Sequence, residues 1–400
     1  MRIGINFNAN DEYISGVEYY SLGLINALVS IDKNNEYYIY TNRPDLITDN
    51  AYQTNNMTVF QTKHIKTRIA RIIWEHTQLP KLAQKHCLDV LHCPSYIVPL
   101  RNTNIPYVAT IHDTIAIDHP EWCKPTNALY YNLLMKISSR KASRIISVSE
   151  RTANDIKRNF RSPDNKIHVI NSGIDKIFNT VKDFPGLNKI KKQYNLPEKY
   201  ILYVGNIEPK KNLSLTLNLQ KHLHQKGFPH KLVIIGKRAW GTKKELVEIT
   251  KEVKSNNIIC TGYVKRNELP SIYQMADVFV FPSLYEGFGF PPLEAMSCGT
   301  PVISTSKGIP NEAVAKAAVI VDPFNTNQIL QATASIINNS ALQKKLIKLG
   351  LEVSSHFSWE KTAEETLNIY EKAAQEKCKT TTNNCHTHLN NLQKYCVEQS

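Results

Sequence analysis

The sequence predicts an α/β protein with two doubly wound parallel β-sheets in two domains that face each other across a cleft. Short, apolar, β-branched segments alternate with helical segments, and this alternation occurs in each half of the chain. Such strands are typical of parallel sheets covered on both faces, and the helices between them form βαβ units. With 400 residues, 42% of them hydrophobic, the chain is long enough for two separate cores.

The expected elements follow this order along the chain. In the first half we expect strands at 2–6, 37–41, 90–92, 107–111, 144–148 and 167–170. In the second half we expect strands at 200–204, 231–235, 258–261, 277–281 and 302–304. Glycine, proline and mixed charge at 173–199 indicate the domain boundary.

These elements predict a Rossmann-like domain over 1–175, a linker over 176–198 and a second Rossmann-like domain over 199–356. An amphipathic helix over 357–376, with Ser358 as its N-cap, should follow. The tail over 377–400 is polar, so we expect it to be disordered. Its spacing of cysteine and histidine matches no standard zinc pattern, so we expect no metal there; the residues are Cys378, Cys385, His386, His388 and Cys396.

The formal net charge of +14 is compatible with nucleic acid, an anionic membrane surface or phosphorylated substrates. Nucleic acid ranks last, because the basic residues are spread along the chain and form no known nucleic-acid module. No apolar run approaches the roughly 20 residues that span a bilayer. The start alternates like a strand and lacks a signal-peptide core, so we expect a cytoplasmic protein with reduced cysteines.

Residues 63–74 predict a basic helix on which Ile65, Ile69, Ile72 and Ile73 share one face. That face could lie on an anionic membrane surface, or it could be buried in the domain. We favour burial, because apolar stripes on helices are mostly core.

The segment at 285–296, YEGFGFPPLEAM, gives the strongest indication of a ligand site. Pro291 and Pro292 suit the first turn of a helix, and glycines in the preceding loop let backbone approach a ligand. Free N–H groups at such a helix start attract an anion such as a phosphate, while Glu286 and Glu294 can accept hydrogen bonds from sugar hydroxyls. A phosphate beside a polyol indicates a nucleotide sugar. The alternative is a capped strand–turn–helix with solvated glutamates.

Three further positions follow predicted strands at the same edge. Lys210 and Lys211 follow 200–204, where two cations can clamp a diphosphate. Gly16 lies in the capping box Ser15–Glu18 that opens the helix 17–30, and it could let backbone approach the diphosphate. His112 follows 107–111 and could hydrogen-bond a sugar hydroxyl or the reacting centre. The alternatives are a solvated basic turn, an ordinary cap and a loop histidine.

The strings EGFGFPPLEAMSCGTPVI at 286–303, GNIEPKKN at 205–212 and IHD at 111–113 resemble glycosyltransferase family 4. The resemblance covers about residues 1–375, and it is strongest to the bacterial O-antigen and capsule mannosyltransferase branch. It implies the GT-B arrangement of two Rossmann-like domains and a retaining transfer of a hexose, mannose in this branch. The donor would be a nucleoside-diphosphate sugar, here GDP-mannose, and the acceptor a glycan or lipid-linked glycan. No metal or other cofactor would take part, and the enzyme would be cytoplasmic or peripheral at the inner membrane face.

By matching position, the resemblance implies that Glu294 binds the ribose hydroxyls and that Glu286 holds the donor sugar. Backbone N–H groups would assist at Gly287, Phe288, Gly289 and Phe290. Lys210 and Lys211 would bind the diphosphate, Gly16 would line it, and His112 would contact the sugar near the reacting carbon. Many relatives have arginine where this chain has Asn206, so we expect Lys210 to carry more of the clamp.

Two other functions stay open from the residues, and a third is not supported. The chain could be a nucleotide-sugar-binding subunit without turnover, or an epimerase that releases free product without an acceptor. A dinucleotide-dependent oxidoreductase would need Gly-x-Gly-x-x-Gly after a strand, and the sequence has none.

Overall fold

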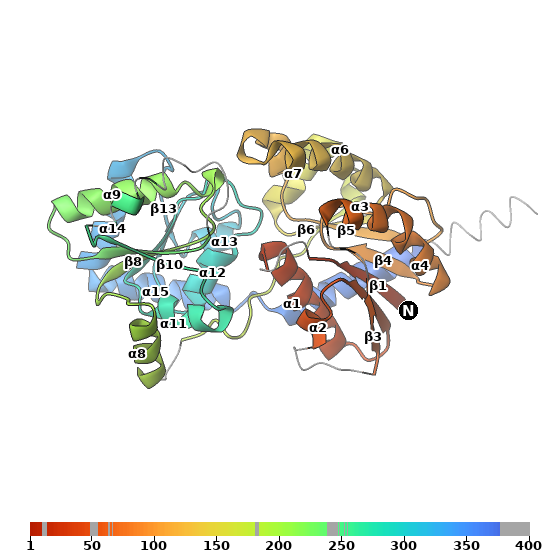
Figure 1. The fold of residues 1–400 in the computed structure, drawn as a ribbon, viewed down its shortest axis with the longest axis horizontal. Helices are drawn as coiled ribbons and strands as arrows, with labels where there is room; N and C mark the ends of the chain where they lie inside the picture. The colour runs from red at the N-terminus through yellow and green to blue at the C-terminus, as the bar shows by residue number, and fades with distance from the viewer. Residues whose placement is uncertain are drawn as a thin grey trace, which may run out of the picture.

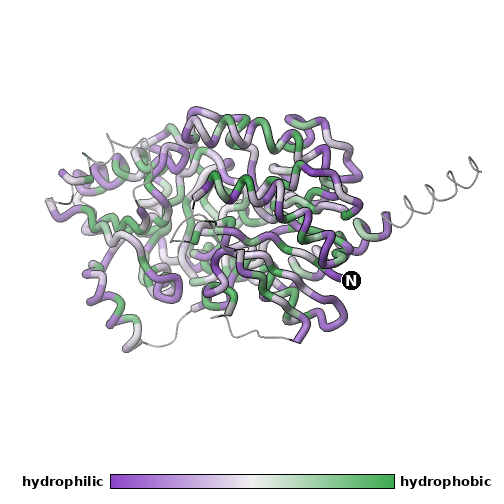
Figure 2. The backbone as a smooth tube through the Cα atoms, turned by 45° about the vertical axis from the view of Figure 1, so that its right-hand side comes forward, coloured by the Kyte–Doolittle hydropathy of each residue, from purple (hydrophilic) through white to green (hydrophobic). Residues whose placement is uncertain are grey.

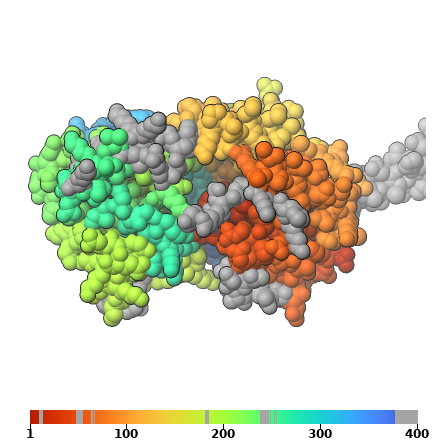
Figure 3. All heavy atoms as spheres, viewed as in Figure 1, coloured from red at the N-terminus to blue at the C-terminus, as the bar shows by residue number. Residues whose placement is uncertain are grey.

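The computed structural model of the chain forms two lobes, each built around one parallel sheet. It describes all residues except 10–13, 49–54, 63–64, 66, 181–183, 238–246, 248, 252, 254 and 377–400, so the Cys/His-containing tail lies outside the described residues. Figure 1 shows the lobes side by side, and Figure 3 shows a furrow between them. Hydrophobic segments run through the interior of both lobes in Figure 2.

The N-terminal sheet has seven parallel strands in the order β3-β2-β1-β4-β5-β6-β7. Their bounds are β1 (Arg2–Phe7), β2 (Glu36–Thr41), β3 (Met57–Gln61), β4 (Val90–Cys93), β5 (Tyr107–Ile111), β6 (Arg144–Ser147) and β7 (Ile167–Val169). The C-terminal sheet has six parallel strands in the order β10-β9-β8-β11-β12-β13. Their bounds are β8 (Tyr200–Val204), β9 (Lys231–Ile235), β10 (Ile258–Gly262), β11 (Val278–Phe281), β12 (Val302–Ser304) and β13 (Val319–Ile320). The predicted fold class is therefore confirmed.

Helices cover both faces of each sheet. The N-terminal lobe has α1 (Gly16–Ile31), α2 (Asp45–Thr48), α3 (Arg68–Thr77), α4 (Leu79–Lys85), α5 (Ile115–Asp118), α6 (Pro125–Lys141) and α7 (Glu150–Phe160). The C-terminal lobe has α8 (Phe184–Gln193), α9 (Leu213–Gln225), α11 (Leu269–Gln274), α12 (Phe290–Ser297), α13 (Glu312–Ala315), α14 (Thr326–Asn338) and α15 (Ser340–Ser354). Among the described residues, no helix is long and apolar enough to cross a membrane.

A last helix over 359–376 leaves the C-terminal lobe and packs on the N-terminal one. The Ser358 hydroxyl accepts a hydrogen bond from the N–H of Lys361, as an N-cap does. In the N-terminal core, the Tyr370 hydroxyl lies 2.6 Å from Nδ1 of His92. The helix is therefore anchored to the first sheet by buried groups.

The expectation that 63–74 buries an isoleucine face is wrong. The helix there, α3, buries Arg71 and Glu75 instead, while Ile69 and Ile73 are exposed. An Arg71 nitrogen lies 3.8 Å from the Glu75 carboxylate, and Asn6 at the end of β1 donates to the same carboxylate. These contacts compensate part of the cost of burying the two charges, although Nε of Arg71 has no hydrogen-bond partner among the described residues, so the polar face can turn inward.

Candidate active site

The predicted site residues lie at the carboxyl ends of strands in both sheets. His112 follows β5, and Gly16 begins α1 after β1. Lys210 and Lys211 lie in a short 3₁₀ turn after β8, and Glu286 lies in the loop between β11 and α12. Figure 1 shows α1 and α12 on the facing sides of the two lobes. A Cβ built on Gly16 would lie 4.0 Å from the Phe290 ring, so these two helix starts face each other closely.

Glu286 is held by a partly buried lysine and a hydroxyl. The Lys211 ammonium lies 2.6 Å from Oε1 of Glu286, and the Ser283 hydroxyl donates to the same oxygen at 2.6 Å. Burial alone would raise the pKa of Glu286, but Lys211 and Lys210 outweigh it and hold that pKa below its ordinary value. Glu286 is therefore an anion with a fixed orientation.

Lys210 lies among carboxylates from both lobes. Its ammonium is 4.0 Å from the Glu208 carboxylate. Burial alone would lower the pKa of Lys210, but Glu286, Glu208 and Asp113 outweigh it and raise that pKa above its ordinary value. The ammonium group is thus charged at neutral pH. Asp113, from the N-terminal lobe, is a site residue that the sequence-based assignment did not include.

Glu294 is bound by a cation that the sequence did not reveal. Nη1 of Arg266 lies 3.1 Å from Oε1 of Glu294, and the Tyr273 hydroxyl donates to Oε2 at 3.2 Å. Burial raises the pKa of Glu294, although Arg266 and Tyr273 partly offset that effect. Arg266 lies soon after β10, at the carboxyl edge of the sheet, and this position was the available signal for it in the sequence.

Arg266 also contacts the other lobe. Its guanidinium carbon lies 4.0 Å from the ring centroid of Tyr19 on α1, and 4.7 Å from that of Phe178. A guanidinium nitrogen is 3.6 Å from the Asp175 carboxylate. A planar guanidinium suits this combination of ring stacking and carboxylate binding. The residue therefore links Glu294 to α1 and to the segment that joins the lobes.

The loop before α12 presents unused backbone donors. Within the described part of the chain, the structure shows no backbone hydrogen bond from the N–H groups of Gly287, Phe288 or Gly289. Gly289 is the N-cap of α12 with a φ of 87°, a conformation that favours glycine. The side chains of Phe288 and Phe290 pack near Phe357 and Trp359 instead. The free N–H groups at this helix start are therefore available to an anion.

His112 is buried and oriented. Its Nε2 lies 2.8 Å from the Pro94 carbonyl oxygen, which can only accept, so Nε2 carries the proton. The Tyr20 ring packs edge-on against the imidazole with centroids 4.8 Å apart. Burial lowers the pKa of His112 to about 4, with a partial offset from the Pro94 carbonyl. The imidazole is therefore neutral near pH 7, with Nδ1 as the acceptor nitrogen.

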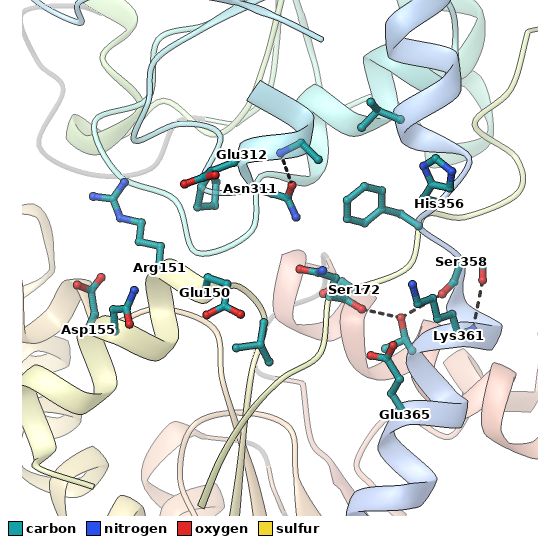
Figure 4. Close-up of a pocket in the computed structure, with 18 residues that line it drawn as sticks. Glu150, Arg151, Asp155, Ser172, Asn311, Glu312, His356, Ser358, Lys361 and Glu365 are labelled. Atoms are coloured by element: carbon teal, nitrogen blue, oxygen red, sulfur yellow. Dashed lines mark hydrogen bonds between the residues drawn. The ribbon is translucent and has the colours of Figure 1, made fainter. Parts of the chain in front are cut away.

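Two further contacts join the lobes beside these residues. The Tyr285 hydroxyl donates to Oδ2 of Asp155 at 2.7 Å, and Ser149 Oγ donates to the Gly287 carbonyl at 2.6 Å. Next to Tyr285 lies a cavity of about 1020 Å³ with walls from α7, α13 and the helix over 359–376. Figure 4 shows Arg151, Asp155, Glu312 and Lys361 around it. None of the predicted donor-site residues lines this cavity.

Comparison with known proteins agrees with this arrangement. A family model described as Glycosyltransferase Family 4 matches residues 14–176, and one described as Glycosyl transferases group 1 matches residues 187–353. The two lobes thus define a glycosyltransferase of the two-Rossmann-domain type. Because the two models together cover most of the chain, it belongs to glycosyltransferase family 4 and is mannosyltransferase-like.

Two relatives illustrate this likeness. O-antigen chain mannosyltransferase B of Escherichia coli is 28% identical over 282 residues, which cover 70% of this chain and 74% of that protein. The serotype-specific mannosyltransferase WbdA of Escherichia coli is 25% identical over 299 residues, 72% of this chain. The match spans only 36% of the length of WbdA.

Solved structures share the fold. Sucrose-phosphate synthase from Thermosynechococcus elongatus superposes with a TM-score of 0.73 at 21% identity, covering 93% of this chain and 98% of that chain. WaaG, a glycosyltransferase involved in lipopolysaccharide biosynthesis, superposes with a TM-score of 0.70 at 14% identity. The superposition covers 92% of this chain and 99% of WaaG. At these identities the likeness supports the fold alone.

Proposed function

We propose that the chain is a retaining, metal-independent hexosyltransferase that uses a nucleoside-diphosphate sugar. One observation carries this proposal: Glu286, Glu294, Lys210 and Lys211 converge with the N-terminal end of α12 at the carboxyl edge of one sheet. The backbone N–H groups of 287–289 and the two ammonium groups suit a diphosphate. The two carboxylates suit the hydroxyls of the ribose and of the transferred sugar.

In this proposal each residue has the role that the resemblance implies for its position in the sequence. Glu294, oriented by Arg266, accepts hydrogen bonds from the ribose. Glu286, fixed by Lys211 and Ser283, accepts hydrogen bonds from the donor sugar. His112 contacts that sugar near the reacting carbon, and Gly16 lines the diphosphate from the other lobe.

The chemical step is a substitution on one face of the anomeric carbon. The bond from that carbon to the diphosphate oxygen breaks, and negative charge develops on the leaving diphosphate. Lys210, Lys211 and the start of α12 stabilise this charge, which is where preorganised cations and dipoles lower a barrier most. The acceptor hydroxyl forms the new bond from the same face, and its proton passes to the departing phosphate oxygen.

The proposed donor is GDP-mannose and the acceptor a glycan or lipid-linked glycan. The relatives named as O-antigen chain mannosyltransferase and serotype-specific mannosyltransferase support mannose as the sugar. A lipid-linked acceptor would place the enzyme in the cytoplasm against the inner face of a membrane.

A thermal-shift screen with EDTA present tests the proposal. The donors compared are GDP-mannose, GDP-glucose and UDP-glucose. A ligand at 100 times its Kd stabilises the folded state by about 2.7 kcal/mol, so binding raises the Tm. We expect the largest rise in Tm with GDP-mannose, and a smaller rise in Glu294→Gln. Glu268→Gln, which alters a glutamate on the surface of the same lobe, serves as the control.

Turnover separates this proposal from its alternatives. Slow release of α-mannose from GDP-mannose, with the anomeric configuration followed by NMR, supports a retaining transferase. Binding without any release indicates a subunit without turnover. A changed sugar still attached to its nucleotide indicates an epimerase.

A further inference from the structure

The cavity of about 1020 Å³ beside Tyr285 lies where the chain crosses between the lobes. Its walls include the first turns of α7 and the segment after β7 from the N-terminal lobe, and the start of α13 from the C-terminal lobe. The two crossing segments meet at its edge, where the N–H of Ile174 donates to the Phe357 carbonyl at 3.0 Å and Ile174 pairs with Ser358. A molecule bound in this cavity would therefore contact both lobes at once.

The wall of this cavity carries charged side chains of both signs that have no ionic partner. They are Glu150, Arg151, Glu312, Lys361 and Glu365. Within the described parts of the chain, the structure shows no salt bridge for any of these five, and the guanidinium of Arg151 lies over the Tyr285 ring at 5.1 Å. Figure 4 shows Glu150 and Arg151 on one side of the cavity and Lys361 and Glu365 on the other. Hydrogen-bond donors and acceptors are thus available to a ligand from several directions.

A buried hydroxyl in the same wall lacks a partner. Ser172 lines the cavity and is 1% exposed, and its Oγ has no hydrogen-bond partner among the described residues. The adjacent carbonyl of Asn171 is already engaged, because it accepts a hydrogen bond from the Thr362 hydroxyl at 2.8 Å. A buried polar group without a partner costs free energy, so a ligand that supplies a hydrogen bond to this hydroxyl from the cavity is favoured.

The two signs of charge together favour a neutral ligand that is rich in hydroxyl groups. A small anion would be repelled by the three carboxylates, and a cation would be repelled by Arg151 and Lys361. Hydroxyl groups instead donate to carboxylates and accept from ammonium and guanidinium groups. Val353 and Phe357 add apolar surface, which suits the C–H faces of sugar rings. The volume lies at the upper end of the range of about 300–1,000 Å³ for ligand pockets, so it has room for more than one sugar ring.

We propose that this cavity is a second carbohydrate site, which holds a short run of a neutral oligosaccharide away from the reacting centre. Its position suits the glycan of the proposed transfer, because Asp155 lines the cavity and bonds to Tyr285, the residue before Glu286. None of the predicted donor-site residues lines the cavity, so the oligosaccharide and the donor can be bound together. The choice of mannose as the sugar rests on the proposed function, whereas the site itself rests on the cavity and its wall.

Isothermal titration of the full chain with an α-linked mannotriose tests the proposal, once without nucleotide and once with saturating GDP to fill the donor site. We expect binding in both titrations. Ser172→Ala removes the hydroxyl without a partner, so it should lower the affinity for mannotriose roughly three- to tenfold without lowering the Tm of the free chain. Lys361→Gln/Glu365→Gln removes two charged groups of the wall and should lower that affinity by roughly tenfold or more. A melting curve for each variant checks that it is folded.

Matched changes away from the cavity are the controls. Thr216→Val removes another buried hydroxyl that has no partner among the described residues, and Glu371→Gln/Lys372→Gln alters two exposed charges further along the last helix. Both should bind mannotriose like the unaltered chain. The proposal is overturned if mannotriose does not bind, if GDP abolishes its binding, or if the cavity variants bind it as well as the controls do.

The outcome is separable from that of the proposed function, because GDP-mannose binding is measured on its own by thermal shift. A chain that binds GDP-mannose but not mannotriose keeps the proposed transferase and loses the second site. A chain that binds mannotriose through the cavity residues but does not bind GDP-mannose keeps the carbohydrate site and loses the proposed donor.

Discussion

Gly287 and His112 meet across the two lobes with no room for a side chain between them. A Cβ at position 287 would lie 1.7 Å from the His112 carbonyl oxygen. Real Cβ atoms essentially never come within 3.0 Å of a neighbouring atom. The loop that carries Glu286 and the loop that carries His112 are therefore held in direct backbone contact, and glycine is what permits it.

Gly287→Ala should thus separate the two loops while leaving each lobe folded. Because a misplacement of about 1 Å can cost roughly 100-fold in rate, we expect a loss of transfer activity of that order. Gly227→Ala is the control, since no atom lies within 4 Å of its Cβ and its φ is 79°. It should cost about 1–2 kcal/mol of stability and keep its activity. Full activity in Gly287→Ala would show that the contact is not needed.

Removal of Arg266 should leave Glu294 as a buried carboxylate without its cation. We expect Arg266→Met to lower the free energy of unfolding by about 3–5 kcal/mol, as broken buried ion pairs do. Urea denaturation measures this loss. Arg266→Met/Glu294→Gln removes the charge as well and should recover part of it. If the double variant were no more stable than Arg266→Met, the pair would not be coupled.

His112 should make the protein less stable in acid. Its folded pKa of about 4 lies below its ordinary value of 6.5, so between these pH values the unfolded chain binds a proton that the folded chain does not. The stability that neutral His112 contributes is fully present above pH 6.5 and is lost as the pH falls through 4. The total loss in the free energy of unfolding has a limit of about 3 kcal/mol.

The measurement is urea unfolding at several pH values for the unaltered chain, His112→Gln and His224→Gln. The loss of stability between pH 6.5 and 4 should be smaller in His112→Gln, whereas the exposed His224 should change little. Equal slopes in all three proteins would contradict the assigned shift in pKa.

Tyr285→Phe should loosen the closed arrangement of the lobes. It removes the hydrogen bond to Asp155 and leaves that buried carboxylate with one partner fewer. A hydrogen bond to a charged group contributes about 1.5–3 kcal/mol, so we expect roughly tenfold or greater loss of activity and a larger radius of gyration in solution scattering. Tyr194→Phe removes a comparable bond to Glu268. That control should change neither quantity.

The fold could be predicted from periodicity, because buried parallel strands contain uninterrupted apolar runs, such as Tyr200–Val204 and the four residues 232–235. Two edge strands, β3 and β13, were not predicted from the sequence. Each pairs with a single neighbour, and β3 is only partly buried, so its sequence lacks a strong apolar pattern. The sequence also failed to predict which face of α3 is exposed, because the Arg71–Glu75 pair is supported by hydrogen bonds to Asn6 in β1 and to the Asn8 carbonyl just after it, both distant in sequence.

The site could be predicted in part. Glu286, Glu294 and the α12 start form one local string, so their proximity follows from sequence. The roles given to His112 and Gly16 stay predictions, although the structure places both on the side of the N-terminal lobe that faces the C-terminal lobe. Arg266 and the Tyr285–Asp155 bond depend on contacts between segments far apart in the chain, which no local pattern encodes.

The most direct test of the central claim is a crystal structure of the chain with GDP-mannose and magnesium in the same solution. The account predicts the diphosphate between Lys210, Lys211 and the start of α12, the ribose on Glu294, and mannose on Glu286. Nucleotide bound away from 286–294, or a magnesium ion that bridges its phosphoryl oxygens in place of the lysines, would contradict it.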